Sequence, residues 1–176
     1  DLNISARTGS IRSRLRIGEA DFANEQLDRI VQGPVTLDAP LRLDLPAIGL
    51  DAATFDSARV SGTVSGAYNT STQEVSGNFR LTAAPAVLPP SLASRFENKI
   101  TAEGYVERTN DGGMAVENLV LTSNAIEAHG SATLRENRLD ADIAGRIPDI
   151  NRWVDNAVGA AGFELSVEGP FERLAI

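Results

Sequence analysis

The sequence predicts an all-β protein: a curled, largely antiparallel sheet with an apolar concave interior and one to three short helices. Three observations lead to this fold class. Apolar or small residues fall on every second position over long stretches, as they do in half-buried strands. Polar corners of turn-forming residues separate these stretches and indicate hairpins. Glycines recur inside the strand patterns, where they mark sharp curvature or close approach of two backbones.

The composition supports a folded chain and excludes several classes of function. Of the 176 residues, 42% are hydrophobic, which is enough for a core. Aromatic residues make up 5% and the net charge is −8, so binding to a nucleic acid is not expected. The absence of cysteine excludes a disulfide framework and a thiolate zinc site. No apolar run approaches the ~20 residues that cross a bilayer.

The N-terminal third alternates less regularly than the rest. Short strands are expected over 2–6 and 11–17, and the first of them reads as mid-strand. The period changes over 18–33, which favours a short helix that stops at Gly33-Pro34; an irregular strand crossing is the alternative. Prolines 34, 40 and 46 are expected to break the next stretch into short pieces, as edge strands allow.

Three hairpins are clear in the remaining sequence. They cover 58–83, 100–123 and 126–145, with turns at 69–73, 110–113 and 135–138. In the second hairpin the alternation slips at Glu117-Asn118, which predicts a β-bulge. A last strand covers 163–170. Hairpin boundaries recur every ~20–25 residues, which indicates a soft internal repeat.

Two short helices interrupt this series of strands. The first is expected over 89–96, with prolines near its start. The second is expected over 147–158, where Pro148-Asp149 begins it and Gly159 ends it. The second helix should carry an apolar stripe made of Ile150, Trp153, Val154 and Val158.

The apolar strand face is built from small and medium side chains, and two interpretations follow. One is a sandwich or barrel with an ordinary packed core, which composition alone favours. The other is a curled sheet whose apolar trough stays open to an apolar guest. In that case the core residues and the ligand-binding residues are the same set. Glycines on the strand patterns suit a strongly bent sheet; they are Gly62, Gly66, Gly77, Gly104, Gly130 and Gly145.

Several motifs resemble a known family. They are "LPPSLASRF" before a strand, "DGGMAVENLVLTS" as a return strand, "IEAHGSATL" followed by "LDADIAGRIPDINRW", and the closing "ELSVEGPFERL". In this order and spacing they resemble the repetitive β domains of TamB, in the wider AsmA-like group of Gram-negative envelope proteins. The resemblance covers 58–176 well and 1–57 loosely, and it involves no catalytic signature.

The resemblance implies a long periplasmic protein of which residues 1–176 are one fragment. Such proteins are anchored in the inner membrane by an N-terminal helix that this sequence does not contain. Their repeats form a curled sheet called a β-taco, and they resemble bridge-like carriers of phospholipid between the two membranes. With an Omp85-family outer-membrane partner, similar to TamA, they are implicated in outer-membrane protein assembly. With the resemblance added, the open trough becomes the favoured interpretation.

Phospholipid acyl chains are therefore expected to lie against the apolar strand faces, with headgroups at the open edge in water. No catalytic residue, cofactor or metal ligand is expected. The residues expected to line this lipid-binding groove are Val60, Val64, Val75, Phe79, Leu81, Ile100, Val106, Val116, Leu119, Leu121, Ile126, Leu134, Leu139 and Ile143.

Other chemically notable residues favour ordinary structural roles. His129 is the one histidine and should face solvent or a neighbour, as should Asp140 and Asp142. The sequence "TNDGG" is expected to be a plain turn, because a calcium loop needs a far longer pattern.

Two further features keep a functional alternative. The arginines at 12, 14 and 16 form a stripe that could meet lipid phosphates or an acidic partner, although a solvated face is the default. Trp153 could plug the trough or pack on its lip, with core packing as the default.

The sequence contains no nucleophile–base set, phosphate loop or metal cluster, so an enzyme is not expected. The alternative to a lipid groove is a structural or docking module. Such a module would bind a partner chain by strand addition at its exposed edges.

Overall fold

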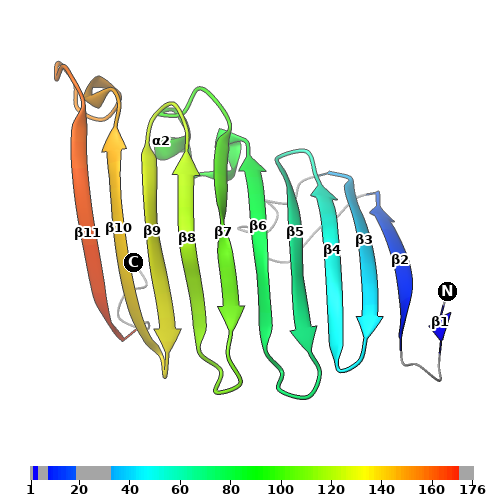
Figure 1. Ribbon diagram of the computed structural model, residues 1–176. Coiled ribbons are helices and arrows are strands. Elements are labelled where there is room, and N and C mark those ends of the chain that lie inside the picture. Colours follow the sequence, from blue (N-terminus) through cyan, green and yellow to red (C-terminus); the bar gives the residue numbers. More distant parts are fainter. Residues whose placement is uncertain (1, 4–7, 19–32, 171–176) are drawn as a thin grey trace.

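The computed structural model describes residues 2–3, 8–18 and 33–170, and these form one antiparallel sheet (Figure 1). The eleven strands lie side by side in sequence order, so each strand pairs with its chain neighbours. The strands are β1 Leu2–Asn3, β2 Thr8–Ile17, β3 Val35–Asp44, β4 Ala47–Asp56, β5 Val60–Asn69, β6 Val75–Ala83, β7 Ile100–Arg108, β8 Met114–Thr122, β9 Glu127–Arg135, β10 Arg138–Ile147 and β11 Ala161–Pro170.

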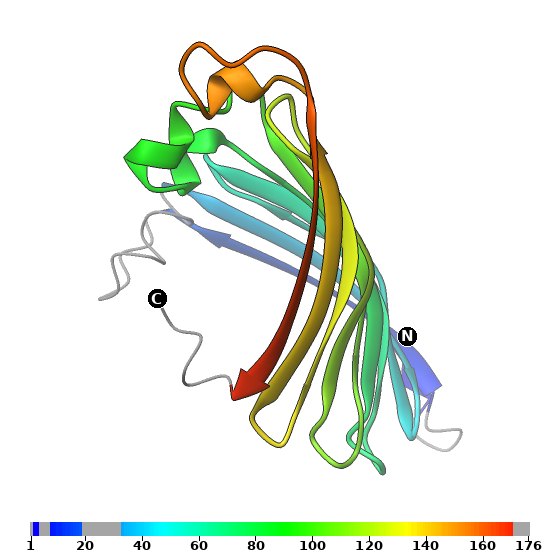
Figure 2. The same ribbon diagram turned by 90° about the vertical axis from the view of Figure 1, so that its left-hand side faces the viewer.

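The sheet is curled and does not close, which confirms the predicted fold class. Figure 2 shows the strands bowed around a concave side, with the short helical segments at one end of the strands on that side. These segments are the 3₁₀-helix η1 (Pro85–Val87), the helix α2 (Pro90–Ala93) and the 3₁₀-helix η2 (Ile150–Arg152). The single open sheet replaces the sandwich or barrel that composition favoured.

The three predicted hairpins are confirmed as β5–β6, β7–β8 and β9–β10. The tightest of them turns at Glu136 and Asn137, whose φ angles are 48° and 62°. Two successive positive φ angles are the geometry of a turn whose twist matches the flanking strands. The strand expected near the C-terminus is also present as β11.

The bulge predicted at Glu117-Asn118 is confirmed, and an equivalent one occurs in β4. The register between β8 and β9 shifts between Val116 and Leu119, where Asn118 has a φ of 51°. The register between β4 and β5 shifts at Ala52, whose φ is 50°. Each bulge restores the in-and-out phase, so that the apolar residues on both of its sides share one face.

A serine turn follows each bulged strand, at Ser57 and at Ser123, so the structure shows a repeat that is longer than the ~20–25 residues predicted from the hairpin boundaries. The Ser57 hydroxyl donates to the Val60 carbonyl and accepts from the Val60 N–H. The Ser123 hydroxyl makes the same pair of bonds with Ile126. The repeating unit therefore contains four strands: a bulged strand, a serine turn, a hairpin, a helical connection and one further strand.

The expectation that prolines divide 34–57 into short pieces is wrong. Pro34 and Pro46 flank full-length strands, and Pro40 lies inside β3 opposite Arg12. The ladder from β3 to β4 is irregular between Asp38 and Leu41. This interruption accommodates a residue that has no N–H to donate.

The helix expected over 147–158 is also wrong in its extent. The Asp149 carboxylate accepts from the Asn151 N–H and begins η2, which ends at Arg152. Asn156 has a φ of 63°, outside the right-handed helical region. Val158 is 97% exposed, so it does not continue an apolar stripe. By contrast, the helix expected over 89–96 is present as the shorter α2.

The helix expected over 18–33 and most of the strand expected over 2–6 lie outside the described residues. Within the described ranges, no helix has the length and hydropathy of a membrane-spanning segment.

The described part of the sheet has no conventional core. No large side chain in it is fully buried, and its buried hydrophobic residues are Val35, Ala53, Val60, Ala125 and Ala141. A core residue in a two-layer domain normally has neighbours on every side. Here the apolar face rests on its own cross-strand neighbours, and much of it is accessible.

Candidate functional site

The strand register collects the predicted groove residues on one face of the sheet. One row across the strands runs through Gly62, Leu81, Ala102 and Leu121, each the register partner of the next. The neighbouring row begins with Val64, Phe79 and Gly104. Of the predicted residues, only Ile126 lies outside a strand, in the serine turn before β9. We call this face the apolar wall.

The apolar wall is accessible along most of its length. Val60 is buried, whereas Val64 and Val75 are each 37% exposed. The other predicted groove residues are half-buried. Partial exposure of this kind on successive strands leaves a contiguous apolar surface open to a ligand.

The wall is wider than the sequence analysis expected. β2 pairs with β3, β3 with β4 and β4 with β5, and this series extends the wall toward the N-terminus. On the other side, β11 pairs with β10 and extends the wall toward the C-terminus. The period-two alternation already contained these positions, which the residue set above omitted. They include Ile11, Leu15, Leu37, Leu41, Leu43, Ile48, Leu50, Phe55, Phe163, Leu165 and Val167.

A pair of glycines forms the floor of a hollow in the wall. Gly66 of β5 and Gly77 of β6 are register partners, so neither contributes a side chain. A Cβ on Gly66 would lie 2.3 Å from the Ser76 carbonyl oxygen, because the two strands are closely curved there. Leu50 and Val106 lie on the outer sides of this pair. The resulting hollow has a volume of about 220 Å³ and an almost entirely apolar lining.

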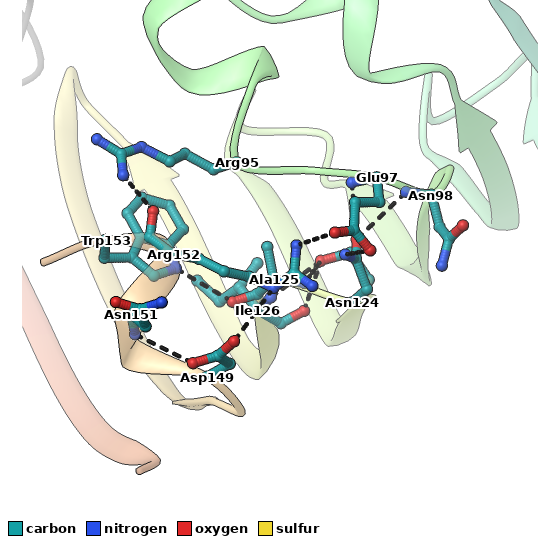
Figure 3. A network of polar contacts seen from close by, with 11 residues as sticks. Arg95, Glu97, Asn98, Asn124, Ala125, Ile126, Asp149, Asn151, Arg152 and Trp153 are labelled. Carbon is teal, nitrogen blue, oxygen red and sulfur yellow. Dashed lines mark hydrogen bonds and ion pairs between the residues drawn. The ribbon is translucent and has the colours of Figure 1, made fainter. Parts of the chain in front are cut away.

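One end of the wall carries a cluster that ties the two helical connections together, which we call the clasp (Figure 3). The rings of Phe96 and Trp153 meet edge to face with centroids 6.1 Å apart. Trp153 Nε1 donates to the Ala125 carbonyl over 3.3 Å. Arg152 forms an ion pair with Glu97 at 2.9 Å, and Arg95 donates to the Arg152 carbonyl. Trp153 is half-buried against Phe96 and Ala125, so the core packing expected for it by default is only partial, and the role of plug or lip stays a prediction.

The opposite face of the sheet is polar and solvated. His129, Asp140 and Asp142 are exposed, as expected. Arg12 and Arg14 both donate to the Asp38 carboxylate, which lowers the pKa of Asp38 to about 2. Two of the three arginines of the stripe therefore bind a residue of their own sheet.

The "TNDGG" segment forms a plain turn, as expected. The Asp111 carboxylate accepts from the Thr109 hydroxyl and from the Gly113 N–H. Both hydrogen bonds lower the pKa of Asp111. The carboxylate thus holds the turn together.

A larger hollow of about 860 Å³ lies over β8–β11. Its lining mixes charged side chains of both signs, such as Glu127 and Arg146, with apolar residues such as Leu121 and Phe163. Leu121 and Phe163 are wall residues, so this hollow borders the same apolar surface, and the charged residues alternate with them along the strands.

One charged residue, Arg108, also lies on the wall and was not among the predicted groove residues. Arg108 is the last residue of β7 and follows Val106 in the alternation. It pairs with Val75 on one side and with Met114 on the other. Continuing the alternation of β7 by one step would have placed it on the wall.

The fold and the wall define the class of protein: an open, curled β-sheet with an accessible apolar concave face. Comparison of the chain with protein-family models, curated proteins and solved structures finds no match.

Proposed function

We propose that this chain is a segment of a TamB-like envelope protein that shields acyl chains during phospholipid transport between the inner and outer membranes. The observation that carries the proposal is the accessible wall. Soluble monomers seldom expose contiguous apolar surfaces larger than a few hundred Å² unless these surfaces bind something. This wall extends across β2–β11 without a covering layer in the described residues.

The dimensions of the wall suit acyl chains. Adjacent strands are about 4.8 Å apart, so the row of strands from β2 to β11 spans about 40 Å. One leaflet of a bilayer core is about 15 Å thick, half of the ~30 Å of the whole. An extended acyl chain can therefore lie along the wall in several successive positions.

The chemistry of the wall suits a mobile ligand. Burying apolar surface yields about 25 cal/mol per Å², or about 0.8 kcal/mol per methylene. Aliphatic side chains and glycines make no hydrogen-bond demand, so this gain changes little from one position to the next. A lipid can then slide along the wall without reaching a deep minimum, and such a surface encodes no direction of movement.

The family resemblance adds the cellular setting to the proposal. The parent protein would lie in the periplasm, anchored in the inner membrane, and would work with an Omp85-family, TamA-like outer-membrane protein. Through that partner it would also support outer-membrane protein assembly. The role is one of binding and carrying rather than of catalysis.

Photo-crosslinking in the parent protein tests the proposal. A photoreactive amino acid at Val64 or Leu121 should capture phospholipid, because both side chains lie on the wall. Thr63 and Val120 are the matched controls. Thr63 directly precedes Val64 and Val120 directly precedes Leu121, so each control side chain faces the opposite side of the sheet. Capture of lipid at the wall positions and not at the controls is expected. Equal capture on both faces, or none on the wall, would refute the carrier role.

A docking role by strand addition is the second candidate, and β11 is the observation that favours it. This ten-residue strand pairs with β10 and with no other described strand. An unpaired edge can accept another strand. Ser166→Lys places a charge on this edge and should abolish partner binding if strand addition is the function. Under the carrier proposal this substitution leaves lipid capture unchanged.

A further inference from the structure

Arg108 is the one charged residue that the strand register places on the apolar wall from β2 to β11. Its partners in the same row are Val75 and Met114, and Tyr68 pairs with Val75 one strand further on. The other in-phase strand positions hold apolar residues, glycines, Ser13 or Tyr68. A cation at such a position interrupts an otherwise uncharged surface.

The guanidinium of Arg108 is available to a ligand. The side chain is exposed, and no hydrogen bond or ion pair connects it to another described residue. Its position contrasts with that of Arg80 on the neighbouring strand β6, which lies on the polar face and forms an ion pair with Glu103 at 2.9 Å. The cation on the wall is thus left without a carboxylate.

Arg108 stands next to the glycine-floored hollow. Val106, two residues earlier in β7, lines that hollow together with Tyr68 and Val75. Arg108 lies one row further toward the end of the strands, in the row of Tyr68 and Val75. A ligand with its apolar part in the hollow would therefore meet the guanidinium at the rim.

No described helical segment covers the end of the sheet that holds Arg108. β7 runs away from α2 and ends at Arg108, while the clasp covers the opposite end of the strands (Figure 1). An exposed rim leaves a polar headgroup in water, which avoids the cost of desolvating it. Long arginine side chains can lie along an apolar surface and still keep their charge hydrated.

We propose that Arg108 binds the phosphate of an anionic phospholipid whose acyl chain occupies the hollow over Gly66 and Gly77. This inference rests on the function proposed above and adds the class of headgroup. The planar guanidinium can donate two parallel hydrogen bonds to a phosphate, a geometry that lysine lacks. Because the net charge of the chain is −8, an anionic lipid needs such a local cation to approach the wall.

The test compares two probes that share their acyl chains: dioctanoylphosphatidylglycerol, which carries a phosphate, and dioctanoylglycerol, which does not. Affinities for the full 176-residue chain are measured by titration calorimetry. Arg108→Gln should weaken binding of the phosphatidylglycerol by about fivefold or more, since it removes a charge-assisted hydrogen bond. The same variant should bind dioctanoylglycerol as the wild type does.

The matched control is Arg80→Gln, the same change on the adjacent strand but on the polar face. It should leave both affinities unchanged. Arg108→Lys keeps the charge but loses the pair of parallel N–H donors, so an intermediate affinity for the phosphatidylglycerol is expected. Raising the salt concentration should weaken the binding of phosphatidylglycerol and leave that of dioctanoylglycerol unchanged, because salt screens an exposed charge pair. Arg108 is exposed, so its variants should keep the wild-type circular dichroism spectrum.

The possible outcomes separate the two proposals. If the wild type binds both probes equally, or if Arg108→Gln binds the phosphatidylglycerol like the wild type, the headgroup assignment is wrong and the carrier function stands. If the wild type binds neither probe, the carrier function fails and the headgroup assignment fails with it.

Discussion

Asp38 shows how single residues on the polar face stabilise the sheet without a core. Its carboxylate accepts from Arg12 at 3.0 Å and from Arg14 at 2.8 Å, and these bonds join β2 to β3. Both arginine side chains are about 70% exposed. Exposed pairs contribute little individually, but two guanidinium groups on one carboxylate lower its pKa to about 2.

Asp38→Asn is expected to change the pH dependence of stability. A carboxylate whose pKa is lower in the folded state contributes stability above its ordinary pKa of about 4 and loses it as the pH falls toward 2. The thermal midpoint of the wild type should therefore exceed that of Asp38→Asn at neutral pH. This difference should shrink between pH 4 and pH 2.

The control for this prediction is Asp140→Asn, which removes a carboxylate that the structure joins to no described arginine. The difference between its thermal midpoint and that of the wild type should stay constant through the same pH range. Parallel curves for Asp38→Asn instead would show that the two arginines do not stabilise the folded carboxylate.

At the scale of elements, the clasp connects two segments that are far apart in the sequence. Phe96 follows α2, and Trp153 follows η2, yet their rings are in contact. Asn124 adds a third segment by accepting from the N–H groups of Glu97 and Asn98. These contacts fix the connections at one end of the trough, where they would otherwise move independently.

Trp153→Ala should loosen the clasp and leave the sheet folded. The change removes an aromatic pair and the hydrogen bond to the Ala125 carbonyl, at a cost of about 1–3 kcal/mol. Hydrogen exchange should accelerate over 85–96 and 150–158, while the amides of β5 and β6 keep their protection.

Val154→Ala is the matched control for the clasp, because its side chain is 54% exposed and adjacent in the chain. It should leave the exchange rates of both connections near their wild-type values. Accelerated exchange throughout the sheet in Trp153→Ala would mean that the clasp supports the whole fold rather than one rim.

At the scale of the whole molecule, the central property is that no second layer covers the apolar face within residues 8–18 and 33–170. The two ends of the wall differ in accessibility. Val60 begins β5 near the helical connections and is 9% exposed, whereas Val64 in the middle of the same strand is 37% exposed. A charge should therefore be tolerated at one of these positions and not at the other.

Val60→Asp is expected to reduce the free energy of unfolding by about 3 kcal/mol or more, because it buries a carboxylate without a partner. Val64→Asp should cost less than about 1 kcal/mol, since water reaches that position, but it should abolish acyl-chain binding. Denaturant titration measures the first quantity and calorimetry with dioctanoylglycerol the second. Equal, large destabilisation by both variants would indicate a sealed core and would contradict the open wall.

Much of the architecture could be read from local patterns. Alternation fixed the strands from β5 to β11, and the phase slip at Glu117-Asn118 located a bulge that the register confirms. The turn at Glu136-Asn137 was equally visible. These features are decided by residues next to one another in the chain, so the sequence is sufficient for them.

The predictions about the proline-rich strands and the second helix were wrong because contacts between residues distant in the sequence decide the structure there. Pro40 is accommodated because the facing strand β4 is bulged, which no local pattern reveals. The helix after Ile147 stays short because Trp153 is engaged in the clasp and Asn156 has a left-handed backbone conformation. Both outcomes depend on neighbours that the sequence does not bring together.

The sequence by itself determined which residues share the apolar face, because a strand alternates its side chains strictly between two sides. Only the tertiary structure decided that this face stays accessible and that Gly66 lies beside Gly77. It also decided that Arg108 lies next to Val75, at the edge of the hollow over these two glycines. The physical reason is that alternation specifies the side to which a residue points. The curl of the sheet and the pairing of its strands decide what, if anything, covers that side.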